Sequence, residues 1–130
     1  AIQPADDKIV AVGYTFDGIL AKVALARYEA NGSLDTSFGT GGIVTTTVGA
    51  NAYATSVTLQ SDGKIVLTGF TEINQPQQSI LIRYATDGSL DTSFGNGGIV
   101  TTLIQNSAQA YALIEQADGK LITAGSSIGN

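Results

Sequence analysis

The residues best suited to chemistry are two aspartates, Asp35 and Asp91, which hold the same place in two copies of Gly-Ser-Leu-Asp-Thr-Ser-Phe-Gly. A carboxylate in such a loop could bind Ca²⁺, which takes several oxygen ligands. One Asp per loop supplies too few hard ligands for a dedicated site, whereas Asp often accepts backbone N–H groups within its own turn. The pattern favours a structural role, with pairing to Arg27 or Arg83 as the alternative, and we expect no metal and no cofactor.

Residues for acid–base or nucleophilic catalysis are scarce. The chain has no His and no Cys, which excludes Ser-His-Asp and Cys-His sets. A glycosidase mechanism needs two carboxylates about 5–10 Å apart across a cleft, but the only adjacent pair, Asp6 and Asp7, is predicted to lie in a hairpin turn. We expect no catalytic residues and no enzyme activity; a hydrolase with carboxylates brought together across repeats is the third alternative.

Phe38 and Phe94 end the two octapeptides and are the next candidates. They could form a stacking platform for a sugar, but a residue that recurs in phase is expected to serve each repeat in the same structural way. We therefore predict that each Phe packs its loop into the neighbouring repeat, where burial of an aromatic side chain contributes about 1.5–3 kcal/mol. The Gly-rich segment that follows precedes a strand and lacks Lys-Ser/Thr, so it is not a phosphate loop.

Positions at which the repeats disagree are where an individual function is expected. Lys22 stands opposite Gln78, Tyr53 opposite Gln109, and Tyr111 opposite Thr55, while one loop is rich in amides. Aromatic rings and amides together could form a carbohydrate- or peptide-binding surface, although ordinary divergence of loops explains the same pattern. The candidate ligand-binding residues are Tyr53, Tyr111, Lys22, Glu72, Asn74, Gln75, Gln77 and Gln78.

Net charge limits the partners of the chain. Six basic residues and a net charge of −5 cannot form the cationic patch that nucleic acids or anionic membranes require. The longest apolar stretch, residues 19–26, is interrupted by Lys22 and is far shorter than the roughly 20 residues of a membrane helix. We expect neither nucleic-acid binding nor membrane insertion.

The elements that must position these residues repeat with a period of 56 residues. Asp62-Gly63 and Asp118-Gly119 each stand between two short apolar runs, which is a strong hairpin signal. β-Branched strands are expected at 9–13, 65–69 and 121–125, each ending in a Gly that marks a bulge or close backbone approach. The other expected strands are 21–28 with 77–84, the Ile-Val-Thr-Thr runs at 43–46 and 99–102, and 54–60 with 110–116.

Four short antiparallel strands per period, with apolar residues on both faces, must stack as successive sheets. Radial repetition of four-stranded sheets is the β-propeller solution. The sequence therefore predicts an all-β fold of tandem four-stranded antiparallel blades, either a β-propeller or a propeller fragment. We place an incomplete first blade at 1–50, a full blade at 51–106 and a half blade at 107–130.

The motif Gln-x-Asp-Gly-Lys-Ile-Val, then Arg-Tyr, then Asp-Gly-Ser-Leu-Asp-Thr-Ser-Phe-Gly-x-Gly-Gly-Ile-Val resembles the delta-60 repeat, a bacterial propeller-type repeat, over essentially the whole chain. The first hairpin departs from the pattern at Asp7. The resemblance implies a blade array of a large bacterial protein that is extracellular or attached to the cell surface, and it transfers no catalytic motif.

Together these observations predict a structural or interaction module without enzyme activity. The first residue is Ala1 and the last lies in mid-repeat, which indicates a piece of a longer protein. Because exposed sheet edges promote association, the expected partners are the remaining blades of the parent chain or copies of this chain. The competing hypothesis is a carbohydrate- or peptide-binding propeller module.

Overall fold

The computed structural model describes residues 1–72 and 76–129, in which all the regular secondary structure is β. In this part of the chain no helix is long and apolar enough to cross a membrane. The predicted all-β fold is confirmed. The strands are β1 (Ile9–Phe16), β2 (Ala21–Tyr28), β3 (Ile43–Thr46), β4 (Asn51–Leu59), β5 (Ile65–Glu72), β6 (Gln77–Tyr84), β7 (Ile99–Thr102), β8 (Ser107–Glu115) and β9 (Leu121–Ile128).

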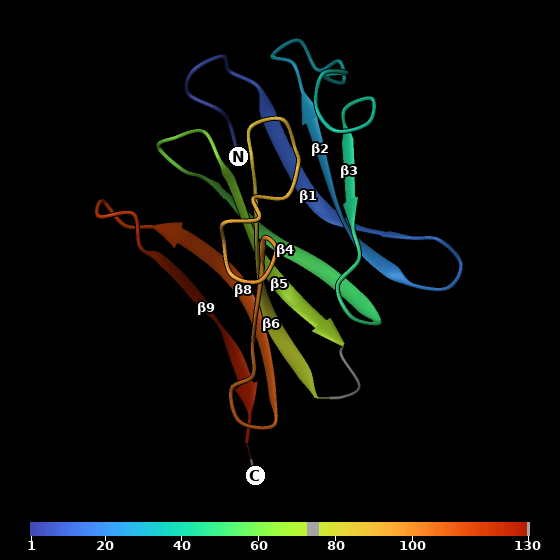
Figure 1. The fold of residues 1–130 in the computed structure, drawn as a ribbon, viewed down its shortest axis with the longest axis vertical. Coiled ribbons are helices and arrows are strands. Elements are labelled where there is room, and N and C mark those ends of the chain that lie inside the picture. Colours follow the sequence, from blue (N-terminus) through green and yellow to red (C-terminus); the bar gives the residue numbers. More distant parts are fainter. Residues whose placement is uncertain (73–75, 130) are drawn as a thin grey trace.

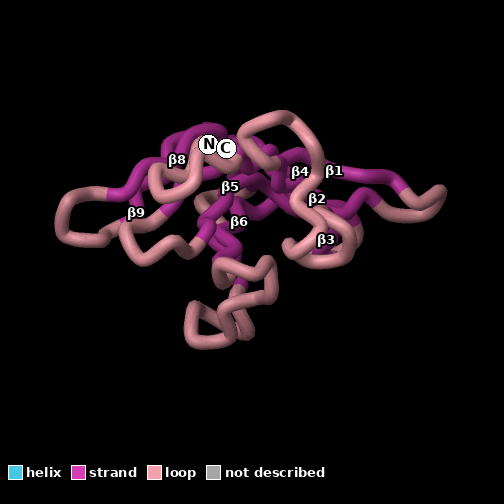
Figure 2. The backbone as a smooth tube through the Cα atoms, turned by 90° about the horizontal axis from the view of Figure 1, so that it is seen from above, coloured by secondary structure: helices cyan, strands magenta, loops and turns pink. Residues whose placement is uncertain are grey.

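These strands form three antiparallel sheets in chain order, β1-β2-β3, β4-β5-β6-β7 and β8-β9. The sheets fan out side by side, with the four-stranded sheet between the other two (Figures 1 and 2). Within each sheet every strand pairs with the next along the chain, so the sheets are built from consecutive hairpins. This is the blade arrangement that the period predicts.

The hairpin turns follow the predicted Asp-Gly chemistry. Gly63 has φ +82° and Gly119 has φ +81°, values that Gly adopts without steric cost. In the second turn the Gly63 amide donates to the Gln60 carbonyl at 2.9 Å. The first turn is one residue longer, because the Asp7 amide donates to the Gln3 carbonyl at 2.9 Å, and Asp7 itself takes the left-handed conformation with φ +57°.

Three strands continue beyond the glycines at which the sequence suggested an end. β1, β5 and β9 each extend three residues further, because the backbone ladder passes through the Gly. The facing strand contains a bulge at this point: Ala54 pairs with Gly69 and Ser56 pairs with Thr68, which leaves Thr55 as the extra residue. A Cβ at position 69 would lie 1.9 Å from the Tyr53 carbonyl oxygen. The predicted close approach is confirmed.

The core lies on the two faces of the middle sheet. In β5 the residues from Ile65 to Gly69 are all buried, whereas every residue of β9 except Leu121 is exposed. Val23, Leu25 and Phe38 of the first repeat join Ile80, Ile82 and Tyr84 of the second in one apolar cluster. The middle sheet is covered on both faces, as its continuous apolar runs indicate.

Candidate functional site

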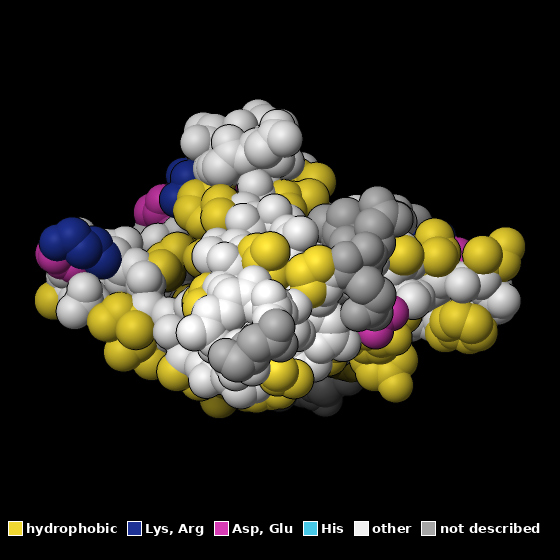
Figure 3. All heavy atoms as spheres, turned by 90° about the horizontal axis from the view of Figure 1, so that it is seen from below, with side chains coloured by type: hydrophobic (Ala, Val, Ile, Leu, Met, Phe, Trp, Pro, Cys, Tyr) yellow, Lys and Arg dark blue, Asp and Glu magenta, His cyan; other side chains and the backbone are white. Residues whose placement is uncertain are grey.

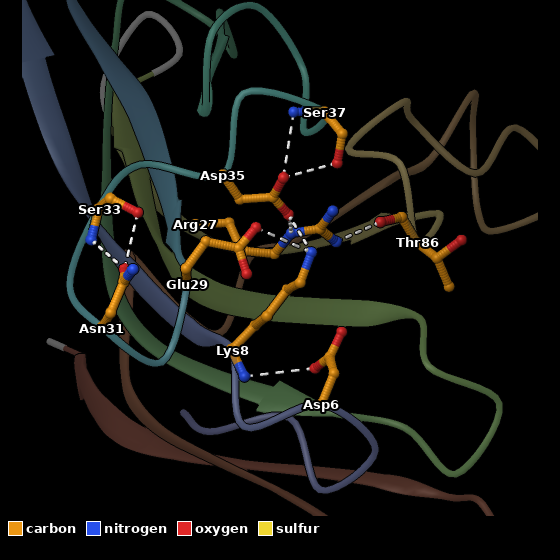
Figure 4. A network of polar contacts seen from close by, with 9 residues as sticks. All are labelled: Asp6, Lys8, Arg27, Glu29, Asn31, Ser33, Asp35, Ser37 and Thr86. Atoms are coloured by element: carbon orange, nitrogen blue, oxygen red, sulfur yellow. Dashed lines mark hydrogen bonds and ion pairs between the residues drawn. The ribbon is translucent and has the colours of Figure 1, made fainter.

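The octapeptide loop of the first repeat is held together by its aspartate. The Asp35 Oδ2 atom accepts from Arg27 Nε at 2.7 Å and from Lys8 Nζ at 2.8 Å, while its Oδ1 atom accepts from the Ser37 hydroxyl at 2.6 Å (Figure 4). The Lys8 ammonium first, and then Ser37, hold the pKa of the Asp35 carboxyl well below its usual range. Asp35 is only 3 % exposed, so it is a buried anion with cationic partners.

The same loop forms the contact between the first and second sheets. Arg27 Nη1 donates to the Thr86 carbonyl at 2.6 Å, and the Gly39 amide donates to the Asp87 carbonyl at 2.9 Å. The guanidinium also lies 4.5 Å from the centre of the fully buried Phe38 ring. The prediction that Phe38 packs its loop into the neighbouring repeat is confirmed.

A glycine is required on the second side of this contact. Gly88 has φ +90°, and a Cβ there would lie 2.8 Å from Val44 Cγ2 and 2.9 Å from Phe38 Cε2. At the matching position of the first repeat, Gly32 has φ +87° and open space around it. The turn of residues 86–88 therefore fits closely against the loop of the preceding repeat.

The second octapeptide loop has the same internal bonds but no such cover. Asp91 Oδ2 accepts from Arg83 Nε at 2.8 Å and pairs with Lys64 Nζ at 3.1 Å. The Arg83 guanidinium lies 4.4 Å from the centre of the Phe94 ring, which is half-buried. Ser93 and then Lys64 lower the pKa of the Asp91 carboxyl. The local chemistry is retained although none of the described residues covers this loop as residues 86–88 cover the first one.

These ion pairs bear on the metal hypothesis. Each repeated aspartate already pairs with one Arg and one Lys and accepts from one Ser, so its charge and its oxygens are engaged within the protein. Within residues 1–72 and 76–129, no group of three or more His, Cys, Asp or Glu side chains is placed to hold a metal ion. The geometry gives Asp35 and Asp91 an electrostatic role in the fold.

A second polar feature, here called the polar row, crosses the three sheets at the end opposite the Asp-Gly hairpins. The Ala21 amide donates to Asn51 Oδ1 at 2.8 Å, and Asn51 Nδ2 donates to Glu72 Oε2 at 3.1 Å. Gln77 Nε2 donates to Glu72 Oε1 at 3.4 Å. The row continues in the third sheet and consists of Asn51, Glu72, Gln77, Gln109 and Tyr111.

The third-sheet part of the polar row contains one of the predicted tyrosines. Gln109 Nε2 donates to Gln77 Oε1 at 2.5 Å, and the Tyr111 hydroxyl bonds to Gln109 Oε1. Tyr111 is the bulge residue of β8 and is 49 % exposed. Figure 3 views the molecule from below, where hydrophobic side chains lie in separate groups among polar and backbone atoms.

Three other predicted ligand-binding residues, Tyr53, Lys22 and Gln78, lie outside this row. Tyr53 packs between two aromatic rings, with centroids 4.9 Å from Tyr14 and 5.1 Å from Phe70. Lys22 Nζ pairs with Asp17 at 2.7 Å in the β1–β2 hairpin. Gln78 lies in β6 opposite Thr71, and the predictions for Asn74 and Gln75 fall outside the described residues. Among the predicted residues that the structure describes, Glu72, Gln77 and Tyr111 are brought together in the polar row.

Several residues of these two features were absent from the candidate set. Gln109 carried a signal, because it is the position at which Tyr53 fails to repeat. Asn51 carried none, because the expected strand begins at residue 54, whereas β4 begins at Asn51. Thr86 and Gly88 carried no signal. A turn requires an Asp-Gly pair for its own conformation, so the sequence does not indicate that the turn also contacts a neighbouring repeat.

The fold and the contact between its sheets define a β-propeller-type repeat. The family model described as "Domain of unknown function (DUF5122) beta-propeller" matches residues 5–38 and 60–94, just over half of the 130 residues, and the chain belongs to this family. The first matched segment begins in the turn before β1 and the second begins in the turn before β5. Both segments end within an octapeptide loop. No curated protein matches the chain.

Proposed function

We propose that the chain is a structural and interaction module without enzyme activity, whose working surface is the face that each repeat presents to the next. It is part of a larger bacterial protein of the delta-60 type, extracellular or attached to the cell surface. Its partners are further blades of the parent chain or copies of itself. The observation that carries this proposal is the contact of Arg27, Phe38 and Gly39 with the turn of residues 86–88.

Support comes from the uncovered copy of that contact surface. Arg83 and Phe94 have the same mutual geometry as Arg27 and Phe38, yet the Arg83 and Asp91 side chains are 19 % and 11 % exposed against 9 % and 4 % for Arg27 and Asp35. A preformed apolar and cationic surface of this kind favours association. The extracellular and bacterial assignments are supported by the sequence resemblance to the delta-60 repeat.

Light scattering across a range of concentrations tests this proposal. We expect a mass above 13.3 kDa that rises with concentration, and a lower mass for Phe94→Glu at the same concentration. The matched control is Thr92→Glu, which adds the same charge to the same loop. Its repeat equivalent, Thr36, stays exposed with the neighbouring sheet in place, so this variant should associate normally. A wild-type chain that stays monomeric and unfolds in one cooperative transition contradicts the proposal.

A second candidate function is glycan or peptide binding at the polar row. An exposed Tyr111 ring beside bonded Gln109 and Gln77 amides combines a stacking surface with fixed hydrogen-bonding groups, as carbohydrate and peptide sites do. A glycan array probed with the associated protein should give a signal that Tyr111→Ala removes and that Tyr28→Ala, at the end of β2 remote from the polar row, leaves intact. An array without signal removes this candidate.

A further inference from the structure

The chain contains two Asn-Gly pairs, Asn31-Gly32 and Asn96-Gly97. Such a pair can react within itself, because the backbone nitrogen of the Gly follows the Asn directly and no Cβ on the Gly obstructs its approach to the side-chain amide carbon. The reaction needs a Gly nitrogen that is free of hydrogen bonds and an Asn side chain that is free to turn toward it. The folded structure decides which of the two pairs meets these conditions.

The first pair is held by hydrogen bonds. The Gly32 amide donates to the Glu29 carbonyl at 2.9 Å. The Asn31 Oδ1 atom accepts from the Ser33 amide at 3.0 Å and from the Ser33 hydroxyl at 2.7 Å. The equivalent turn of residues 85–89 has the same bonds. Because both reacting groups must first leave their partners, we expect the first pair to react slowly.

The second pair lies in the tight turn that leads into β7. The Asn96 amide donates to the Ile99 carbonyl at 2.8 Å, and the turn itself consists of Gly97 and Gly98, with φ +63° and +97°. Among the described residues, none accepts a hydrogen bond from the Gly97 amide or bonds to the Asn96 side chain, and both residues are exposed. Both reacting groups are therefore free in the folded protein.

This turn stays open to solvent when a neighbouring sheet covers its loop. In the first repeat the equivalent residues are Thr40 and Gly41, with φ +61° at Gly41. They are exposed although the adjacent Gly39 amide donates to the Asp87 carbonyl of the second sheet. A Cβ added to Gly41 would have nothing within 4 Å. The accessibility of Asn96 is thus a property of the turn and does not depend on an uncovered surface.

We propose that Asn96 is a site of spontaneous deamidation, with water as the second reactant. Solvent removes the Gly97 amide proton, the Gly97 nitrogen bonds to Asn96 Cγ, and the side-chain nitrogen takes a proton from solvent and leaves as ammonia. Water then opens the resulting succinimide ring at one of its two carbonyl carbons, which yields aspartate or isoaspartate without oxidation or reduction. This modification goes beyond the proposed function and does not require association.

The two products should affect β7 differently. Aspartate keeps the main chain and adds one negative charge, which takes the net charge from −5 to −6. Isoaspartate carries the main chain through the side-chain carbon, so the Asn96 carbonyl that accepts from the Ile99 amide at 3.3 Å becomes part of a free carboxylate. The turn then loses its main-chain closure, and we expect the start of β7 to open more readily.

Peptide mapping by mass spectrometry, during incubation of the 130-residue protein at mildly alkaline pH, tests this proposal. We expect Asn96 to convert at least tenfold faster than Asn31, with isoaspartate among the products. In concentrated urea the two pairs should convert at similar rates, because only the fold distinguishes them. The matched control is Asn96→Thr, which introduces the residue that the first repeat has at this turn. Its map should show no mass change there, while Asn31 reacts as in wild type.

Two results overturn the inference. One is a folded protein in which Asn96 converts less than tenfold faster than Asn31. The other is a tenfold preference for Asn96 that persists in urea, which would assign the selection to the local sequence and not to the fold. The measurement is independent of light scattering: a protein that associates but fails this test keeps the proposed function, and a monomeric protein that passes it keeps this inference.

Discussion

The loop of residues 29–42 and the loop of residues 85–98 have nearly the same sequence and the same internal bonds, but only the first is covered by a neighbouring sheet. In both, an aspartate pairs with an Arg eight residues earlier, at 2.7 Å and 2.8 Å. Phe38 is fully buried, whereas Phe94 is half-buried. The repeat sequence is thus sufficient for the internal structure of the loop, whereas burial of its Phe requires contact with a neighbouring sheet.

The same distinction applies on the opposite side of the repeat. Tyr84 is buried and shares a hydrogen bond of 2.6 Å with Thr46 of the preceding sheet, whereas its equivalent Tyr28 is half-buried. Gly69 faces the Tyr53 carbonyl, whereas Gly13 has nothing within 4 Å of its added Cβ. Equivalent residues of identical type are therefore expected to contribute differently to the free energy of unfolding. The same substitution made at both positions measures this difference.

The largest difference is expected between Gly69→Val and Gly13→Val. A Cβ at position 69 would overlap the Tyr53 carbonyl at 1.9 Å, which forces the β4–β5 ladder apart and should cost more than about 4 kcal/mol. The Gly13 variant should change stability by no more than about 0.5 kcal/mol. Urea unfolding followed by circular dichroism measures both, and equal tolerance would refute the close approach.

The next difference is expected between Phe38→Ala and Phe94→Ala. Removal of the buried Phe38 ring leaves a cavity between the first and second sheets and should cost about 3–5 kcal/mol. In a monomeric sample, removal of the half-buried Phe94 ring should cost less than half as much, because solvent already reaches it. Urea midpoints at low protein concentration provide the measurement. Losses of equal size would mean that contact with the neighbouring sheet does not determine how much this Phe contributes to stability.

Much of the fold was predictable because it rests on local chemistry that recurs. Asp-Gly pairs place the hairpins, and β-branched runs such as Ile43–Thr46 and Ile99–Thr102 become strands with the expected bounds. The ends of β1, β5 and β9 were not predictable from the Gly that stops each apolar run. The ladder continues there because hydrogen bonding of the backbone does not require a side chain.

The candidate site was less predictable, for a physical reason. Disagreement between repeats singled out Tyr111, and the amide-rich loop singled out Gln77; the structure joins the two through Gln109. Disagreement also singled out Tyr53, which packs between Tyr14 and Phe70. The turn of residues 86–88 repeats in phase and looks purely local. Its contact with Arg27 joins residues 59 positions apart, and no short-range pattern encodes such a separation.

The dependence of stability on pH under acidic conditions should reflect the ion pairs of Asp35 and Asp91. Lys8 and Ser37 lower the pKa of Asp35, and Ser93 and Lys64 lower that of Asp91. Each carboxyl therefore contributes stability that is fully present above the unfolded pKa of about 3.9 and is lost as the pH falls toward the lower folded value.

Asn at either position should flatten the stability curve below about pH 4, because the group that titrates there has been removed. At pH 7, Asp35→Asn should destabilise the protein more than Asp91→Asn does. The Arg27 side chain is 9 % exposed and would lose its anion, whereas the Arg83 side chain is 19 % exposed and is better solvated. Urea midpoints at pH 7 and pH 3 test both statements. Equal losses at pH 7 would show that the neighbouring sheet adds nothing to the ion pair.

The smallest difference is expected between Tyr84→Phe and Tyr28→Phe. Phe at position 84 preserves the ring but leaves the buried Thr46 hydroxyl without its partner, which should cost about 1–2 kcal/mol. Tyr28 makes no side-chain hydrogen bond within the described part of the chain, so its variant should lie within about 0.5 kcal/mol of wild type.

Alkaline unfolding provides the second measurement for this pair. Burial raises the pKa of Tyr84 to about 12, against the opposing effect of the Thr46 hydrogen bond. Because the folded pKa is raised, the contribution of Tyr84 is fully present below the unfolded value of about 10 and is lost as the pH rises toward 12. Tyr84→Phe should therefore lose less stability between pH 10 and pH 12 than wild type does, whereas Tyr28→Phe should follow the wild-type curve. If both variants follow it, Tyr84 is not desolvated by the preceding sheet, and the contrast between covered and uncovered repeats fails at this position.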